Sequence, residues 1–193
     1  MLGPFEEVVL ASTSSARRAL MEGLGVPFRV VAPEVSEDVV PGTPPQHAVA
    51  ILAERKARAV YSRFPRALVI GSDQLVSLQG QTLGKPVDEQ AARAQLGSLR
   101  GKTHEIFTGL TVVGAGFVVT EVDTAKLTVL PLSDEELDGY VATGEWKGCA
   151  GAYRVEARGQ ALFQRIEGDR AAIQGLPMQR LTRMLREAGV RFF

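Results

Sequence analysis

The stretch ALVIGSDQLV at residues 67–76 places a carboxylate, Asp73, inside an apolar run that is typical of a buried strand. A buried carboxylate without a partner is strongly destabilising, so a chain that keeps one usually gives it a cation, a metal ion or a catalytic task. Asp73 therefore requires positively charged groups from elsewhere in the chain. A purely structural salt bridge is the alternative that remains open.

A second polar segment, ASTSSARR at residues 11–18, is suited to binding a phosphate. It follows an apolar strand and opens a helix, whose first N–H groups carry partial positive charge. The hydroxyl groups of Ser12, Thr13 and Ser14 precede Arg17 by a few residues. Cations at a helix N-terminus oppose the helix dipole unless an anion offsets them. The segment therefore predicts an anion site, with a simple N-cap and solvated arginines as the alternative.

Two lysines could complete such a site. Lys56 has apolar residues three and four positions away on a predicted helix, so it lies within the apolar stripe. Lys85 stands between a glycine and a proline in LGKP, on a loop of restricted conformation soon after Asp73. The alternatives to a role in this site are that the Lys56 side chain extends past the apolar surface to solvent and that Lys85 is an ordinary surface residue.

Composition restricts the class of protein. The 193 residues contain 22 Lys and Arg against 22 Asp and Glu, so a global field that would bind nucleic acid is not expected. The single cysteine, Cys149, excludes an internal disulfide framework, and the His and Cys spacings do not predict zinc. Signal-peptide and membrane-span patterns are also missing from the sequence. We expect a cytoplasmic protein with no membrane partner.

The elements that must position these residues follow from apolar periodicity and from turn and cap signals. Strands are expected at 6–12, 27–33 and 67–73, a hairpin turn at 79–80, a long hairpin at 103–132, and short strands at 151–156 and 161–168. Helices are expected at 14–25, 45–64, 88–99, 133–144 and 177–187, with capping boxes at Thr43–Gln46 and Ser133–Glu136. The pattern predicts an α/β fold with a mixed sheet, flanking helices and two lobes around a central cleft. Asp73 is expected at the C-terminal edge of its strand, where such sheets place ligands.

Seven separated motifs resemble, in order, those of the Maf family of nucleotide pyrophosphatases. They are LASTSSARR (10–18), LAERKA (52–57), GSDQ (71–74), LGKP (83–86), GKTHEIFTG (101–109), CAGAYRVE (149–156) and IQGLP (173–177). The resemblance covers the chain from Val8 to about Gly189. It implies one Maf-like domain over residues 1–193 and a two-lobed fold shared with the inosine triphosphate pyrophosphatase group. It also implies a Mg²⁺ or Mn²⁺ ion, a homodimer, and hydrolysis of a nucleoside triphosphate to the monophosphate and pyrophosphate.

The resemblance also implies roles for individual residues. Asp73 matches the proton acceptor, although it could instead hold the metal, and Glu37 matches a carboxylate on the metal side. The residues that match phosphate contacts are Ser12, Arg17, Lys56 and Lys85, with Thr13 and Ser14 at the helix start. Ser15 replaces the family's usual proline, and Ala16 stands where relatives tend to have arginine or tryptophan.

The family has a dTTP/UTP branch and a 7-methyl-GTP branch, and this sequence is more similar to the second. Gln74 stands where the pyrimidine branch has threonine, and Glu156 where it has glutamine. An ionised glutamate can accept both the N1 and N2 donors of the cationic 7-methylguanine base, whereas thymine offers one donor between two acceptors. A dTTP/UTP pyrophosphatase remains the alternative substrate class. A non-catalytic nucleotide-binding regulator of cell division, which the family's septum-formation label implies, is the alternative to an enzyme.

Overall fold

The computed structural model describes residues 2–193, which form two compact units. The first unit comprises the residues up to Gln74 together with 108–123 and 169–193. The second comprises residues 75–107 and 124–168. Three long strands contribute residues to both units: β3 (Ala67–Leu78), β5 (Thr103–Gly114) and β6 (Phe117–Val129).

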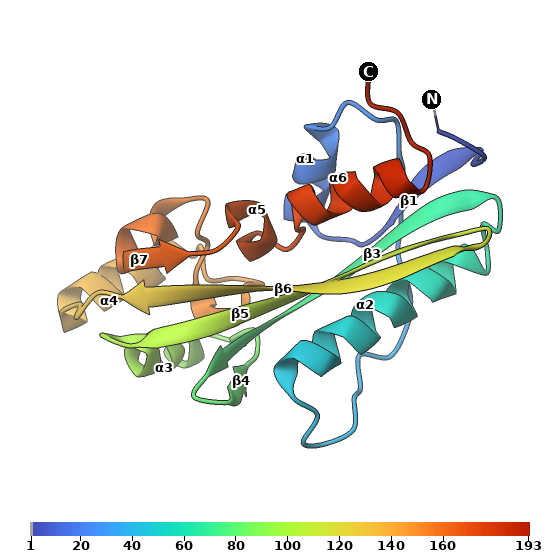
Figure 1. Ribbon diagram of the computed structural model, residues 1–193. Coiled ribbons are helices and arrows are strands. Elements are labelled where there is room, and N and C mark those ends of the chain that lie inside the picture. The colour runs from blue at the N-terminus through green and yellow to red at the C-terminus, as the bar shows by residue number, and fades with distance from the viewer. Residues whose placement is uncertain (1) are drawn as a thin grey trace. The chain divides into compact units, whose positions relative to one another are not determined.

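Within residues 2–193 the strands form a mixed seven-stranded sheet in the order β2-β1-β3-β5-β6-β7, with β4 pairing to β3 (Figure 1). The remaining strands are β1 (Glu7–Ala11), β2 (Arg29–Val31), β4 (Gln81–Leu83) and β7 (Phe163–Glu167). β1 is parallel to both β2 and β3, whereas β4 and β7 are antiparallel to their neighbours. The predicted mixed α/β sheet is therefore confirmed.

Helices flank the strands of each unit. Those of the first unit are α1 (Ser15–Glu22), α2 (Pro45–Tyr61), α5 (Arg170–Ile173) and α6 (Met178–Glu187). Those of the second are α3 (Glu89–Leu99), α4 (Asp134–Ala142) and the short 3-10 helices η1 (Ala150–Ala152) and η2 (Arg158–Leu162). Among residues 2–193, no helix combines the length and the apolarity that a membrane span requires.

In the first unit, the strands carry apolar side chains on both faces. Leu10 and Leu68 point toward α1 and α6, where they pack with Met21 and Met184. The neighbouring residues of each strand point to the opposite face. There Val9 and Val69 pack with Ala57 and Val60 of α2. Figure 1 shows α2 on one side of these strands and α6 on the other. The first unit is thus a three-layer arrangement with β1 and β3 largely buried, as expected for parallel strands.

The contact between α2 and β3 is unusually close. A methyl group added at Gly71 would lie against the backbone oxygen of Ala53 and within 2.7 Å of the backbone nitrogen of Ala57. A side chain at position 71 would therefore push the helix away from the sheet. Glycine at this position lets α2 lie directly on the strand that carries Asp73.

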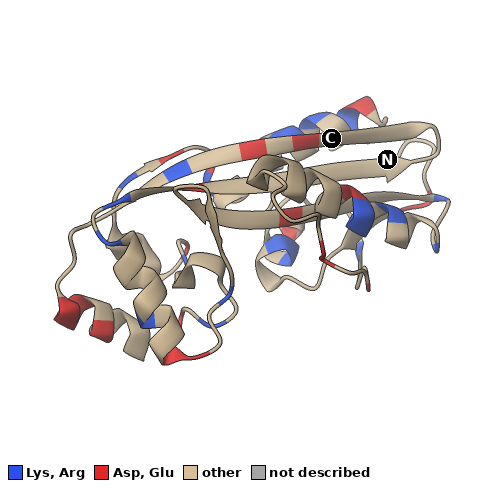
Figure 2. Cartoon of the chain, turned by 90° about the horizontal axis from the view of Figure 1, so that it is seen from below, with Lys and Arg blue, Asp and Glu red and all other residues tan. Residues whose placement is uncertain are grey.

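Ion pairs fasten α6 to β6 within the first unit. Arg180 contacts Glu121 at 2.7 Å and Asp123 at 2.8 Å, and Arg183 also pairs with Glu121. Figure 2 marks the positions of Lys and Arg in blue and those of Asp and Glu in red along the chain. These side chains are partly exposed, so each pair contributes little to stability. The hydrogen bonds to both arginines lower the pKa of the Glu121 carboxyl, opposing the effect of its burial. In this network the arginines of α6 are paired with the carboxylates of β6, and the pairs hold α6 against β6.

Three local predictions differ from the structure. The capping box at Ser133–Glu136 is formed, but the one predicted at Thr43–Gln46 is wrong, because Pro44 is the N-cap and Thr43 donates its hydroxyl to the Val40 carbonyl at 2.7 Å. The helix expected at 14–25 ends at Glu22, with Gly23 as its C-cap. The strand expected at 151–156 is also wrong, since Gly151 (φ +79°) and Ala152 (φ +62°) adopt left-handed conformations that turn the chain.

Candidate active site

Lys56 joins two carboxylates in the first unit. Its Nζ lies 2.5 Å from Oδ1 of Asp73 and 2.5 Å from Oε1 of Glu37. The Lys56 and Asp73 side chains are only 9% and 10% exposed, whereas that of Glu37 is 67% exposed. The ion pair with Asp73 is therefore largely withdrawn from solvent, where charge pairing is stronger than at the surface. The cation that the buried Asp73 requires is Lys56, seventeen residues earlier in the chain.

The strand register explains how Asp73 becomes available. The parallel pairing of β1 with β3 ends at Ala11 and Gly71. Asp73 lies two residues beyond this point, although β3 itself continues to Leu78. The expectation that Asp73 stands at the end of its own strand is therefore wrong. Asp73 lies past the end of the neighbouring strand β1, and not past the end of β3.

Arg17, in the first turns of α1, is a further charged residue near these carboxylates, whose charges act on its guanidinium. Its Nε donates to the carbonyl oxygen of Gly175 at 2.8 Å. Burial lowers the pKa of the Arg17 guanidinium, while the charges of Asp73 and Glu37 act in the opposite direction. Arg17 remains cationic at neutral pH, because the ordinary pKa of arginine is above 12. Two cations and two carboxylates therefore form one charge-balanced cluster.

Ser72 and Gly175 hold this cluster in place, and the sequence patterns did not indicate either role. The buried Ser72 hydroxyl lies 2.8 Å from the carbonyl oxygens of both Gly109 and Gly175. The Gly175 carbonyl thus accepts from Ser72 of β3 and from Arg17 of α1. Gly175 has φ +107°, and a side chain there would contact Nε of Arg17 at 3.1 Å. Only the fold reveals this link, because the residues are more than 100 positions apart.

The loop that carries Glu37 is held by α2. Arg55 donates from Nη1 to the carbonyl oxygens of Ser36 at 2.8 Å and of Asp38 at 2.7 Å. These are the residues immediately before and after Glu37. Arg55 was not among the predicted site residues, because a long side chain that reaches a distant loop leaves no pattern in the sequence.

Gln74 has contacts that differ from those expected of a substrate-binding residue. Its Nε2 lies within 3.0 Å of the Thr108 hydroxyl and of the carbonyl oxygens of Ala172 and Ile173. An amide nitrogen carries two hydrogens, so these three acceptors engage its full donor capacity. Gln74 thereby connects β3 to α5. A contact with substrate would have to use its Oε1 atom.

The remaining predicted residues near α1 lie at the start of that helix. Ser12 is buried, and its Oγ accepts from the backbone nitrogen of Ser14 at 3.1 Å. Ser14 is the N-cap, as the sequence predicts. Thr13 is exposed in the turn, and Ala16 is a partly buried residue of the first helical turn. The backbone N–H of Arg17 donates to Oγ of Ser14 at 3.4 Å, whereas the geometry of a helix start leaves the N–H groups of the two preceding residues without intrahelical acceptors, so these two could meet an anion.

Lys85 and Glu156 belong to the second unit. Lys85 is exposed on the loop after β4, next to Gly84, whose carbonyl accepts from Nε2 of Gln95 at 3.0 Å. Glu156 is also exposed, and its Oε1 lies 3.6 Å from Nε of Arg154. The structure therefore places both side chains at the surface of their unit, where they can meet a ligand.

The segment that precedes Glu156 is anchored by aromatic residues of the second unit. Nε2 of His104 lies 2.6 Å from the Tyr153 hydroxyl, and Tyr153 packs edge-on against Phe163. The backbone nitrogen of Arg154 donates to the Tyr140 hydroxyl at 3.0 Å. Burial lowers the pKa of His104 to about 4 and raises the pKa of Tyr140 to about 12. His104 is therefore neutral at physiological pH and serves as an internal support.

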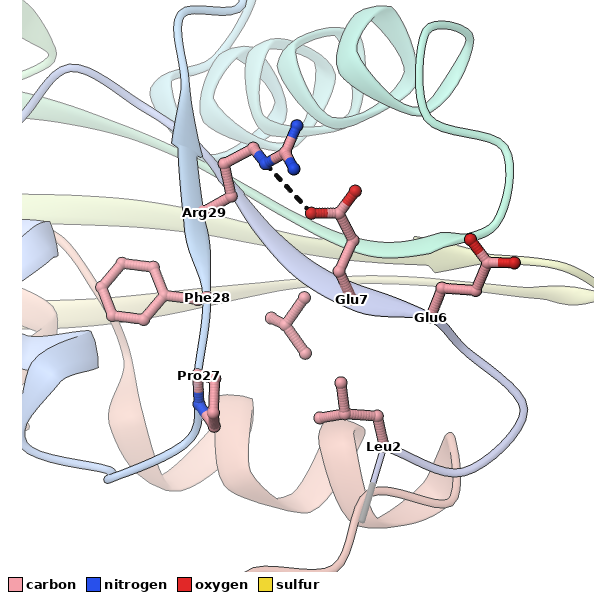
Figure 3. Close-up of a pocket in the computed structure, with 7 residues that line it drawn as sticks. Leu2, Glu6, Glu7, Pro27, Phe28 and Arg29 are labelled. Atoms are coloured by element: carbon pink, nitrogen blue, oxygen red, sulfur yellow. Dashed lines mark ion pairs between the residues drawn. The ribbon is translucent and has the colours of Figure 1, made fainter.

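A pocket of about 280 Å³ lies elsewhere in the first unit. Figure 3 shows Leu2, Pro27 and Phe28 around it, with the Arg29–Glu7 ion pair (3.1 Å) at one side. Its residues surround the start of β1, whereas Ser12 follows the end of that strand. Because a strand rises by roughly 3.3 Å per residue, the pocket is separated from the charged cluster by most of the length of β1.

The cluster offers two carboxylates to a metal ion. Within residues 2–193, no group of three or more His, Cys, Asp and Glu side chains is arranged to hold a metal. Asp73 and Glu37 nevertheless bring one oxygen each within 2.5 Å of a common point, the Nζ of Lys56. Mg²⁺ is usually held by one or two carboxylates and completes its octahedron with phosphate oxygens and water. The donor set therefore fits a divalent ion that is shared with a phosphate-bearing ligand.

The comparison with protein families shows to which family the chain belongs. Residues 7–188 match the model of the Maf family, described as Maf-like protein. The chain belongs to the Maf family. The resemblance that the sequence motifs indicated is thus confirmed over nearly the whole chain.

Curated relatives carry two different names. A dTTP/UTP pyrophosphatase of Symbiobacterium thermophilum is 39% identical over 97% of this Maf protein and 97% of its own length. A 7-methyl-GTP pyrophosphatase of Xanthomonas campestris is 42% identical over 94% of this chain and 96% of its own. Among solved structures, a HAM1 protein from Coxiella burnetii aligns with a TM-score of 0.51 at 14% identity over 94% of this chain and 98% of its own. The last similarity concerns the fold alone.

Proposed function

We propose that this Maf protein hydrolyses a nucleoside triphosphate to the monophosphate and pyrophosphate. The observation that carries the proposal is the joining of Asp73 and Glu37 by one buried ammonium group, that of Lys56. The Arg17 guanidinium, which is bonded to Gly175 and lies 3.5 Å from the Ser12 hydroxyl, adds a second cation. Cations and carboxylates held together in this way suit metal-assisted phosphate chemistry better than binding alone. The names of the curated relatives support the same reaction class.

The phosphates are held by positive groups of the chain. The start of α1 offers backbone N–H groups, Arg17 offers its guanidinium, and Lys56 can turn its ammonium from the carboxylates toward a phosphate oxygen. For Lys85, on the loop after β4, the proposal rests on its match to a phosphate-contacting lysine of the family. These groups neutralise the negative charge that builds on the leaving oxygens, which is the main protein contribution to phosphoryl transfer.

The carboxylates act on the metal and on water. A divalent ion held by Glu37 and Asp73 would polarise the phosphate and lower the pKa of a bound water molecule. Asp73 accepts a hydrogen bond from the attacking water and takes up its proton. The water oxygen forms a bond to the α-phosphorus, and the bond from that phosphorus to the oxygen bridging to the β-phosphate breaks. Pyrophosphate leaves with the electron pair of the broken bond.

We further propose 7-methyl-GTP as the substrate, with Glu156 as the residue that reads the base. The Glu156 side chain is 34% exposed, and its Oε1 lies 3.6 Å from Nε of Arg154, which is long for an ion pair. Such a carboxylate can accept from the N1 and N2 donors of 7-methylguanine and is attracted by the charge of its ring. The observation that favours the second candidate, dTTP or UTP, is the 39% identical relative of that name.

A pyrophosphate-release assay tests both the proposed reaction and the proposed substrate. The protein should be presented with 7-methyl-GTP, GTP, dTTP and UTP, each with Mg²⁺ and with Mn²⁺. We expect release that depends on the divalent ion and is fastest with 7-methyl-GTP. Preference for dTTP and UTP would establish the second candidate. Saturable binding of these nucleotides without release of pyrophosphate would instead establish a binding protein.

The role of Asp73 is tested by Asp73→Asn, which preserves the shape of the side chain. We expect turnover to fall by at least about a thousandfold, because the variant lacks both the proton acceptor and one metal-side charge. Nucleotide affinity should change much less, since Arg17 and the start of α1 remain. Near-normal turnover in a folded Asp73→Asn protein would contradict the assignment.

A further inference from the structure

The position of the Lys56 ammonium has a consequence for metal binding. Its Nζ lies 2.5 Å from one oxygen of Asp73 and 2.5 Å from one oxygen of Glu37, so these oxygens are no more than twice that distance apart. Two ligand oxygens of an octahedral ion, each about 2.0–2.1 Å from Mg²⁺, fall within the same range. The space between the two carboxylates can thus accept either the ammonium group or a divalent ion, but not both.

Charge balance leads to the same conclusion. Lys56 and Arg17 together offset the charges of Asp73 and Glu37, so the cluster is neutral when all four groups are ionised. A divalent ion that bound alone would add two positive charges beside an ammonium and a guanidinium. A triphosphate that bound alone would add about four negative charges beside two carboxylates. Each ligand therefore offsets the charge that the other brings.

We infer that Lys56 and the divalent ion compete for Asp73 and Glu37, so that the ion binds tightly only together with a triphosphate. This inference rests on the proposed function for the assignment of the two carboxylates to the metal. The triphosphate supplies a new anionic partner for the Lys56 ammonium, which leaves the carboxylates for a phosphate oxygen. Lys56 thereby couples metal binding to substrate binding, and the coupling is reciprocal by thermodynamic linkage.

The side chains involved are suited to this exchange. Lysine has a flexible four-carbon stem, so its ammonium can change partners without movement of α2. Glu37 is 67% exposed and can adjust to a different partner at little cost. The buried partner, Asp73, is never left without a cation, because the divalent ion replaces the ammonium group. The exchange therefore avoids an unpaired buried carboxylate.

The test measures Mn²⁺ binding to the protein by equilibrium dialysis, without nucleotide and without turnover. The variant Lys56→Met removes the competing ammonium, and Arg58→Met is the matched control. Arg58 lies on the same helix, is exposed, and pairs with Glu54 rather than with the cluster. We expect Lys56→Met to bind Mn²⁺ at least tenfold more tightly than the wild type. Arg58→Met should stay within about twofold of the wild type, although it loses the same charge.

A second measurement uses inorganic tripolyphosphate as the probe, with manganese and phosphorus both counted on the protein side of the membrane. In the wild type, saturating tripolyphosphate should tighten Mn²⁺ binding at least tenfold. In Lys56→Met, tripolyphosphate should increase the affinity for Mn²⁺ by a smaller factor, because the ion no longer has to displace an ammonium group from the two carboxylates. Unchanged or weaker Mn²⁺ binding by Lys56→Met, or the absence of coupling in the wild type, would overturn the inference.

Two controls keep the outcomes separate. If Lys56→Met does not fold, as judged by circular dichroism, Lys56→Gln replaces it, because an amide can donate a hydrogen bond to Asp73. The tripolyphosphate coupling of the wild type needs no variant at all. If Asp73→Asn and Glu37→Gln leave Mn²⁺ binding in the presence of tripolyphosphate unchanged, the metal assignment of the proposed function is wrong. If they weaken it while Lys56→Met has no effect, only the competition is refuted.

Discussion

Arg55 donates two hydrogen bonds to the main chain on either side of Glu37, at 2.8 Å to the preceding carbonyl and 2.7 Å to the following one. Glu37 lies in a long segment between β2 and α2, where the chain has no regular secondary structure. Its exposed side chain alone could not fix its position. Arg55 therefore serves as a positioning residue for Glu37, and it acts from the helix that also carries Lys56.

The first prediction concerns the two hydrogen bonds from Arg55 to the main chain beside Glu37. We expect Arg55→Met to raise the Mg²⁺ concentration needed for half-maximal activity by about tenfold, because one lost charge-assisted contact is worth about 1.5–3 kcal/mol. The KM for the nucleotide at saturating Mg²⁺ should change less than threefold. A metal titration of pyrophosphate release measures both quantities. Arg58→Met, with the same loss of charge on the same helix, should leave the metal titration unchanged. An equal effect of the two variants would exclude a specific role for Arg55.

The second prediction concerns the close contact between α2 and β3. In Gly71→Ala, the new methyl group would contact the backbone of Ala53 and Ala57, so the helix must move. We expect the free energy of unfolding to fall by at least about 1–3 kcal/mol, the usual cost of an overpacked core. Activity should also fall, because the movement carries Lys56 away from Asp73.

Urea unfolding and pyrophosphate release check this second prediction on the same samples. Gly97→Ala is the matched control, since position 97 lies in α3 and has open space for a methyl group. Alanine is the better helix former, so we expect this control to be stabilised by about 0.5–1 kcal/mol with unchanged activity. A Gly71→Ala protein as stable and active as the wild type would show that α2 adjusts freely.

The third prediction concerns pH. Burial lowers the pKa of folded His104 to about 4, below its ordinary value of 6.5. The unfolded chain therefore binds a proton that the folded protein does not bind between about pH 6.5 and pH 4. Stability from this histidine is fully present above pH 6.5 and is lost as the pH falls toward 4, by up to about 3 kcal/mol. Urea denaturation at pH 7.5, 5.5 and 4.5 measures the loss.

The control for the histidine is His104→Asn, which cannot gain a proton. Its stability at pH 7.5 will be lower, because the hydrogen bond to the Tyr153 hydroxyl changes. Its loss of stability between pH 7.5 and pH 4.5 should nevertheless be smaller than that of the wild type. The same slope in both proteins would assign the pH dependence to other groups.

The fourth prediction concerns base recognition. In Glu156→Gln the acceptor for N1 and N2 of 7-methylguanine becomes a neutral amide. We expect the ratio of kcat/KM for 7-methyl-GTP to that for dTTP to fall by about tenfold or more, since a charge-assisted hydrogen bond is worth about 1.5–3 kcal/mol. Parallel kinetics with both substrates measure the ratio. Glu167→Gln, an exposed glutamate of β7 that pairs with Arg165, should leave the ratio unchanged. An unaltered ratio in Glu156→Gln would argue for a different base-reading residue.

Local signals in the sequence predicted most of the elements. Ser14 and Ser133 are N-caps, the hairpin of β5 and β6 turns at Ala115–Gly116, and the apolar runs become β1 and β3. Such signals act through hydrogen bonds and sterics within four or five residues, so the sequence carries them completely. They fail where distant contacts prevail. In the segment before Glu156, the packing of Tyr153 against His104 and Phe163 favours a turn over the expected strand.

In the candidate site, too, some features could be predicted from the sequence and others depend on the tertiary structure. An aspartate within an apolar run required a cation, so Asp73 followed from the sequence alone. The apolar neighbours of Lys56 placed it within the apolar stripe of its helix but left a side chain that reaches solvent as the alternative, and the structure decides for burial. The pairing of Lys56 with Asp73, the contact of Lys56 with Glu37, and the support from Arg55, Ser72 and Gly175 were decided by the tertiary structure. The physical reason is that these contacts depend on where β1 ends beside β3 and on how closely α2 lies on Gly71. Both are set by packing between segments far apart in the chain, which no local pattern of residues encodes.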